Sequence, residues 1–194
     1  MPFYEIYHHC PLSISQQDEL AAAITDIHAH KFGALKNFVN VSFKDISTAP
    51  RYIAGKRQTS NQIFAWVRTG PSRTQEDWND LIEQVTKAWD NICGTPLPQA
   101  KGRTTPDTSL RMVAVMGGLV AAMEAGFVIP QAGGDAQWMR DNWEAFKQRA
   151  DAGEQEFVDM VKDAQDRGLV EGQGDADKRA QQRLEEMLGW GDSA

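Results

Sequence analysis

The chain has few cysteines, no long hydrophobic run and less positive than negative charge, and each shortage excludes a class of protein. Its 194 residues include only two cysteines, Cys10 and Cys93. Two are too few for a disulfide framework and lack the spacing of a metal site, so we expect both to be buried as small apolar side chains. Lysine and arginine number 20 against 27 aspartate and glutamate, a net charge of -7. No nucleic-acid partner is therefore expected, because nucleic-acid binding needs a basic surface.

Membrane and cofactor signals are also missing. No apolar stretch is long enough to cross a bilayer, and the start of the chain has neither the basic nor the apolar segment of a secretory signal. We therefore predict no membrane partner and a cytoplasmic location. The glycines have no phosphate-loop or dinucleotide spacing, and adjacent histidines point in different directions, so no cofactor and no metal are predicted. With 41% hydrophobic residues, the chain can still bury a substantial core.

The first third of the chain has the pattern of a β-α-β unit. Residues 2–8 read as a strand, and Ser13 with Gln16 forms the capping box that begins a helix. Apolar residues at three- and four-residue spacing continue this helix to about Gly33. Residues 39–43 then alternate between apolar and polar, which is typical of a strand with one buried face.

The same pattern recurs further along. Residues 62–68 read as a strand, a helix runs from about Thr74 to Gly94, and residues 110–116 supply another strand after a polar loop. We predict an α+β fold in which two consecutive β-α-β units form a four-stranded sheet with two helices on one face. The uncovered sheet face favours an oligomer. Residues 1–134 would form this domain, and residues 135–194 a helical C-terminal extension.

Pro2 is the most informative single residue. If Met1 is removed, Pro2 becomes an N-terminal secondary amine, whose ordinary pKa of roughly 7.7 to 8.0 suits proton transfer near neutrality. Burial or nearby cations would lower that pKa and favour a base, whereas a nearby carboxylate would raise it and favour an acid. Alone, a proline at the start of a strand is an ordinary feature.

Several segments, in order, resemble the tautomerase superfamily, and within it the cis-3-chloroacrylic acid dehalogenase group. They cover about two-thirds of the chain and are Met1-Pro2-Phe3-Tyr4, residues 23–28, residues 39–43, residues 52–54, Arg68 to Thr74, and Glu124-Ala125-Gly126 with Pro130. The resemblance implies a tautomerase fold, a homotrimer and a small carboxylate substrate.

The resemblance also implies roles for individual residues. Pro2 would handle the substrate proton, and Glu124 would activate water for hydration. His28, Arg68 and Arg73 would bind the substrate carboxylate. The family's tyrosine corresponds to Val113, which has no hydroxyl to orient a water, and Pro71-Ser72 resembles an insertion between the arginines.

Residue chemistry leaves alternatives at each implied position. An arginine pair suits a carboxylate because each planar guanidinium donates two parallel hydrogen bonds. Arg68 could instead reach solvent at a strand end, and Arg73 lies near a helix start, where a cation is disfavoured. His28 follows Ile24 by one helical turn on the buried edge, and is either a satisfied core residue or a substrate contact. Glu124 is either exposed at a turn or held in a pocket.

Three functions follow from these observations. The leading hypothesis is a keto-enol tautomerase, an isomerase that uses Pro2 to move a proton on a 2-oxo acid without a cofactor. The second is a hydratase or dehalogenase that adds water to an unsaturated acid with Glu124. The third is a trimeric scaffold without catalytic activity.

Overall fold

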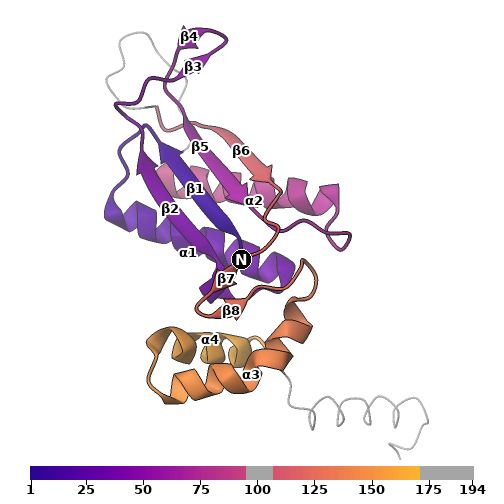
Figure 1. Ribbon diagram of the computed structural model, residues 1–194. Helices are drawn as coiled ribbons and strands as arrows, with labels where there is room; N and C mark the ends of the chain where they lie inside the picture. Colours follow the sequence, from indigo (N-terminus) through magenta and orange to yellow (C-terminus); the bar gives the residue numbers. More distant parts are fainter. Residues whose placement is uncertain (95–106, 171–194) are drawn as a thin grey trace, which may run out of the picture. The chain divides into compact units, whose positions relative to one another are not determined.

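The computed structural model in Figure 1 describes residues 1–94 and 107–170. The described chain divides into two compact units, and the boundary between them in the sequence lies between Asp135 and Ala136. None of the described helices is long and apolar enough to cross a membrane. The same described segments contain no cluster of histidine, cysteine, aspartate or glutamate suited to a metal ion.

The first unit is built on a four-stranded sheet. Its strands are β1 (Phe3–His8), β2 (Asn40–Asp45), β5 (Asn61–Trp66) and β6 (Leu110–Met116), in the spatial order β2-β1-β5-β6. β1 runs parallel to β2 and β5 runs parallel to β6, while the central strands β1 and β5 are antiparallel. Two β-α-β units therefore lie side by side, as the sequence predicts.

Two helices, α1 (Ile14–Phe32) and α2 (Gln75–Cys93), cover one face of this sheet (Figure 1). Each begins with a capping box, formed by Ser13 with Gln16 and by Thr74 with Asp77. α1 ends at Gly33, whose φ of 63° is the left-handed conformation that favours glycine. The predicted starts of both helices are confirmed, and a short 3-10 helix (Lys36–Phe38) leads into β2.

The core lies between the sheet and these helices. The inner strand residues alternate along the chain as period two requires, and the largest buried side chains are Trp89, Tyr4, Ile6, Leu20, Ile24, Ile63 and Leu81. Cys10 and Cys93 are free and buried here, which confirms their prediction as small core residues. Burial raises the pKa of the Cys93 thiol to about 12, so it stays protonated.

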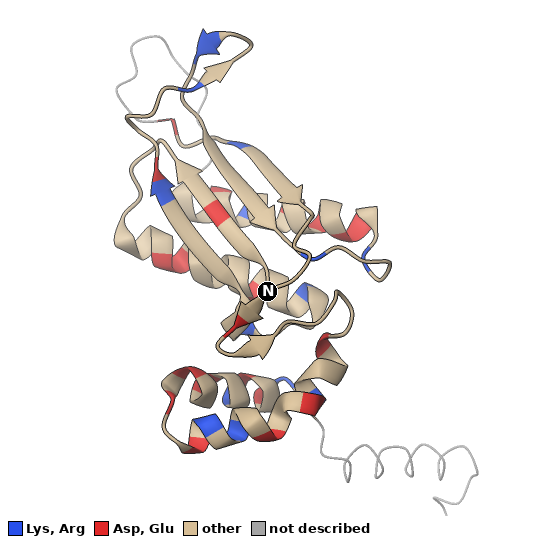
Figure 2. Cartoon of the chain, in the orientation of Figure 1, with Lys and Arg blue, Asp and Glu red and all other residues tan. Residues whose placement is uncertain are grey.

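The opposite face of the sheet is only partly covered within one chain. Tyr7 and Phe64 make an edge-to-face ring contact with centroids 5.6 Å apart, and the Trp66 indole donates a 2.9 Å hydrogen bond to Glu5. Trp66 is 39% exposed. Charged residues are sparse along the four strands (Figure 2). This face therefore combines three aromatic side chains with an ion pair between Lys44 and Glu5.

Two short hairpins were not predicted. β3 (Tyr52–Ile53) pairs with β4 (Lys56–Arg57), and β7 (Met123–Glu124) pairs with β8 (Phe127–Val128). In each, an Ala-Gly pair makes the turn, and both residues have positive φ: 51° and 74° in the first, 50° and 87° in the second. Such turns usually carry Asn-Gly or Asp-Gly, so alanine in the left-handed region concealed them.

Two helices form the described part of the second unit. α3 (Asp135–Asp151), whose first residue belongs to the first unit, and α4 (Gln155–Asp166) pack through Phe146 and Phe157, with ring centroids 6.0 Å apart. The guanidinium of Arg149 lies 4.0 Å over the Phe157 ring. Helices in the extension are thus present, while residues 171–194 of the predicted extension lie outside the described residues.

Candidate active site

The start of the chain lies in a partly buried, charged environment. Pro2 is buried, and its carbonyl accepts a 3.1 Å hydrogen bond from the backbone N–H of Asn40 on the neighbouring strand. Burial first, and the charge of Arg68 second, lower the pKa of the Met1 amino group to about 5, against the opposing effect of the Asp135 and Glu124 carboxylates. Arg73 also lowers it, by the smallest amount.

Arg73 precedes the N-cap of α2 and is fixed by aromatic rings. Its guanidinium lies 4.4 Å over the Phe32 ring and 5.7 Å over the Trp78 ring, and Nη1 donates to the Arg68 carbonyl at 3.0 Å. Only 5% of its side chain is exposed. Burial and the neighbouring Arg68 charge lower the pKa of Arg73. A cation buried at a helix start is unfavourable unless something stabilises it, which these rings do.

Arg68 follows β5 and is bound to the segment after β8. Its Nη1 donates to the carbonyl of Pro130, with a longer contact of 3.4 Å to the carbonyl of Gln131. Its Nη2 donates to Oδ1 of Asp135 at 2.7 Å. The alternative in which Arg68 reaches solvent at the strand end is wrong, because only 8% of its side chain is exposed.

Asp135 is a site residue that sequence reasoning missed. Besides its bond to Arg68, its Oδ2 lies 3.8 Å from Nη2 of Arg73. Oδ2 is buried and has no hydrogen-bond partner among the described residues. No motif indicated Asp135, since it is the first residue of a segment predicted only as a helical extension.

His28 projects from α1 into the same region and is neutral. Burial, followed by the charge of Arg73, lowers the pKa of His28 to about 3. The Tyr4 hydroxyl lies 2.8 Å from Nδ1 of His28. Burial raises the pKa of Tyr4, so the phenol keeps its proton and can donate it to Nδ1, which leaves the imidazole proton on Nε2. The buried position of His28 is confirmed; Tyr4 was missed, although alternation along β1 places it on the inner face.

Glu124 lies on β7 with its carboxylate held by a neighbour. Oε1 accepts a 2.8 Å hydrogen bond from the side-chain amide of Asn40. Oε2 is buried without a hydrogen-bond partner among the described residues. Glu124 is half-buried rather than exposed, and it is not among the residues that line the cavity beside Arg68. Asn40 was also missed, because strand alternation indicated only an ordinary polar position.

The loop that carries both arginines packs against the segment before α3. A Cβ at Gly70 would lie 3.2 Å from the Ala132 Cβ, and one at Gly133 would lie 2.8 Å from the Ser72 Oγ. Gly133 also has a φ of 89°, so glycine is required there on both grounds. The Pro71-Ser72 segment therefore lies against the segment that supplies Asp135.

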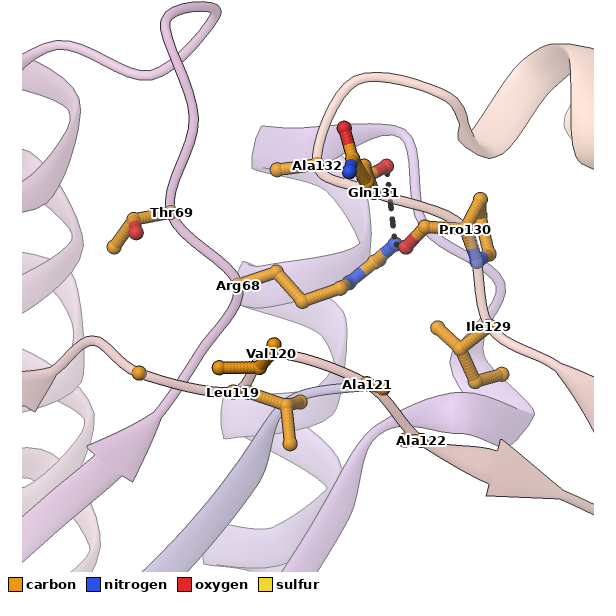
Figure 3. A pocket seen from close by; sticks show the side chains of 11 residues that line it. Arg68, Thr69, Leu119, Val120, Ala121, Ala122, Ile129, Pro130, Gln131 and Ala132 are labelled. Carbon is orange, nitrogen blue, oxygen red and sulfur yellow. Dashed lines mark hydrogen bonds between the residues drawn. The ribbon is translucent and has the colours of Figure 1, made fainter.

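A cavity of about 330 Å³ opens beside Arg68 (Figure 3). The Arg68 side chain extends toward Pro130 along one wall, and the surface of the cavity is more polar than apolar. Thr69 and Gln131 line it together with the aliphatic side chains of Leu119, Val120, Ala121, Ala122, Ile129 and Ala132. Its volume is at the lower end for small-molecule sites. Val113 lies apart from this cavity lining and packs against the core.

Comparisons with known proteins agree with this architecture. A family model described as "Putative oxalocrotonate tautomerase enzyme" matches residues 1–143. The crystal structure of N1, a member of the cis-3-chloroacrylic acid dehalogenase family, aligns with a TM-score of 0.54 and 22% identity, covering 71% of this chain and 90% of that one. The Q0 fused 4-OT wild-type symmetric trimer aligns with a TM-score of 0.50 and 16% identity, covering 68% and 98% respectively. Both structures share the fold. No curated protein sequence matches the chain.

Proposed function

Because the chain belongs to the tautomerase family whose model matches residues 1–143, we propose that it is an enzyme that uses Pro2 for proton transfer. Pro2 becomes the terminal residue once Met1 is removed. The observation that carries this proposal is the environment of the chain start, where the Pro2 residue is buried and where burial and Arg68 lower the pKa of the Met1 amine to about 5. An amine in such surroundings is neutral at pH 7 and has a lone pair available to accept a proton.

The proposed reaction is the conversion of the enol of a small 2-oxo acid to its keto form. The Pro2 nitrogen takes the proton of the enol O–H, and the electron pair of that bond forms the new C=O bond. The electron pair of the former C=C bond then takes the same proton from the Pro2 ammonium and forms a C–H bond at carbon 3. Arg73 would hold the substrate carboxylate with Arg68, and the Nε2–H of neutral His28 would donate to the oxygen on which charge develops. The cavity beside Arg68 provides space for the rest of the acid.

Water addition is a second candidate function, favoured by one observation. Asn40 holds Oε1 of Glu124 at 2.8 Å, which leaves Oε2 without a partner among the described groups. In this reaction Glu124 takes a proton from water, the water oxygen bonds to the β-carbon of an unsaturated acid, and the α-carbon takes a proton from the protonated form of Pro2, which is the minor form of an amine with a lowered pKa. Val113 supplies no hydroxyl to orient the water, so we rank hydration and dehalogenation below tautomerisation.

We also propose a homotrimer. Its support is the sheet face opposite α1 and α2, which carries Tyr7, Phe64 and the 39% exposed Trp66. Sedimentation velocity on the purified protein should give a mass close to three times 21.6 kDa. A monomeric mass would contradict the trimer.

One experiment separates tautomerase, hydratase and scaffold. The ultraviolet absorbance of phenylenolpyruvate, a related dienol acid and cis- and trans-3-chloroacrylate is followed with the wild type, Pro2→Ala and the control Pro50→Ala, which changes an exposed proline. Enol decay that Pro2→Ala abolishes and Pro50→Ala keeps supports the tautomerase. Halide release supports the hydratase, and no change with any acid supports the scaffold. If intact-mass measurement shows Met1 retained in the purified protein, the proposed proton transfer is wrong.

A further inference from the structure

The proposed proton transfer leaves one carboxylate of the site without a role. Asp135 extends to both arginines, with Oδ1 2.7 Å from Nη2 of Arg68 and Oδ2 3.8 Å from Nη2 of Arg73. A single carboxylate thus faces two guanidinium groups with one oxygen toward each. A substrate acid held by the same two arginines would need this position.

The two oxygens of Asp135 are bound unequally. The 2.7 Å contact of Oδ1 is a hydrogen bond, whereas 3.8 Å is too long for one. Oδ2 is buried and lacks a hydrogen-bond partner within the described residues. An oxygen that has lost water without gaining a hydrogen bond is poorly stabilised. Asp135 is therefore held firmly by Arg68 but only weakly by Arg73, and a ligand that offers the two arginines more hydrogen bonds than Asp135 does can displace it.

Asp135 also has a favourable place when displaced. It is the first residue of α3, where the helix dipole stabilises a negative charge. Two glycines, Gly133 and Gly134, directly precede Asp135, and Gly133 has a positive φ. Glycine allows more backbone conformations than any other residue, so the backbone before Asp135 can adjust when its side chain moves. The helix start and the preceding glycines therefore reduce the free-energy cost of releasing the Asp135 carboxylate from the arginines.

We propose that Asp135 is a specificity-determining residue, whose carboxylate occupies the substrate position between Arg68 and Arg73 so that an acid binds only by displacing it. A plain carboxylate such as propanoate offers the arginines only what Asp135 already offers. A 2-oxo acid brings a third acceptor oxygen beside its carboxylate, which Arg73 or the Nε2–H of His28 can bind. Asp135 thereby selects 2-oxo acids over plain acids. The inference rests on the proposed function only for the identity of the acid.

Calorimetric titration of the Met1-free protein with pyruvate and with propanoate tests this inference without turnover. We expect the wild type to bind pyruvate at least about tenfold more tightly than propanoate. In Asp135→Asn, propanoate should bind about tenfold more tightly than in the wild type, so that the preference shrinks. The control Asp151→Asn, at the other end of α3, makes the same charge change and should behave like the wild type.

Asp135→Ser provides a second variant, because serine is well accepted at a helix start and preserves folding. Equal affinity of the wild type for the two acids would overturn the inference by itself. So would unchanged or weaker propanoate binding in Asp135→Asn and Asp135→Ser, since Asp135 would then only hold the arginines in place. Failure of Pro2 to catalyse enol decay leaves these binding results intact, so the two proposals fail separately.

Discussion

The hydroxyl of Tyr4 lies 2.8 Å from Nδ1 of His28, and both side chains are buried. Tyr4→Phe removes this hydrogen bond while keeping the ring that fills the core. The imidazole would lose the contact that keeps its proton on Nε2, so we expect kcat/KM for enol decay to fall about tenfold, as for loss of one buried hydrogen bond. Tyr52→Phe, which changes a tyrosine that is 63% exposed, is the matched control. An equal effect of both substitutions would contradict the assignment.

The neutral state of His28 predicts an acid-dependent loss of stability. Burial lowers the pKa of His28 to about 3, below its ordinary value of 6.5. Neutral His28 therefore contributes stability in full above pH 6.5, and this contribution is lost as the pH falls toward 3. The loss is on the order of 4 kcal/mol across that range. Urea unfolding at a series of pH values gives the free energy of unfolding at each pH. Between pH 6.5 and 3 this free energy should fall less steeply for His28→Gln than for the wild type, and as steeply as the wild type for His30→Gln, since His30 is exposed.

The terminal amine predicts the low-pH limb of the activity profile. The burial and the Arg68 charge that lower the pKa of the Met1 amine should also lower the pKa of Pro2 after processing. In the proposed reaction the neutral amine is the base, so kcat/KM should be constant at pH 7 to 8 and fall as the pH drops through a value below the ordinary 7.7 to 8.0. If kcat/KM instead begins to fall at a pH above 8, the Glu124 and Asp135 carboxylates raise the pKa of Pro2 by more than burial and Arg68 lower it. Titration of a ¹⁵N-labelled Pro2 would assign the limb.

Glu124→Gln separates the two chemical hypotheses. Glutamine keeps an oxygen to accept the hydrogen bond from Asn40 but cannot take a proton from water. We expect proline-dependent enol decay to stay within about threefold of the wild type, while any halide release from 3-chloroacrylate falls at least about 100-fold. Loss of enol decay to the same extent would place Glu124 in the tautomerase reaction itself. Glu154→Gln, which changes a glutamate of the second unit, controls for charge.

The fold was predictable because local signals and the global pattern agree. Ser13 and Thr74 are the N-caps of α1 and α2, close to where the sequence predicts each helix to begin. The alternation over residues 39–43 also identifies the face of β2 that packs against the core. The two Ala-Gly hairpins were not predictable, since the left-handed conformation of Ala54 and Ala125 is disfavoured for alanine and is imposed by the surrounding structure.

The candidate site was predictable where a residue type is unusual at its position, as for Pro2 and Arg73. It was not predictable where an ordinary residue becomes relevant only through folding. Asp135 is 67 positions from Arg68 in the chain, and Glu124 is 84 from Asn40, yet each pair is hydrogen bonded. Contacts over such separations have no local periodicity to indicate them.

Asn40 bonds to the Pro2 carbonyl through its backbone N–H and to Glu124 through its side chain. The alignment of the first two strands is thereby coupled to the positions of Pro2 and Glu124, the two groups of the proposed reactions. A shift of one residue in their pairing would turn the Asn40 amide to the other face of the sheet. Turnover would then report correct strand alignment during refolding, and a misaligned but compact molecule would be detectable as folded protein without activity.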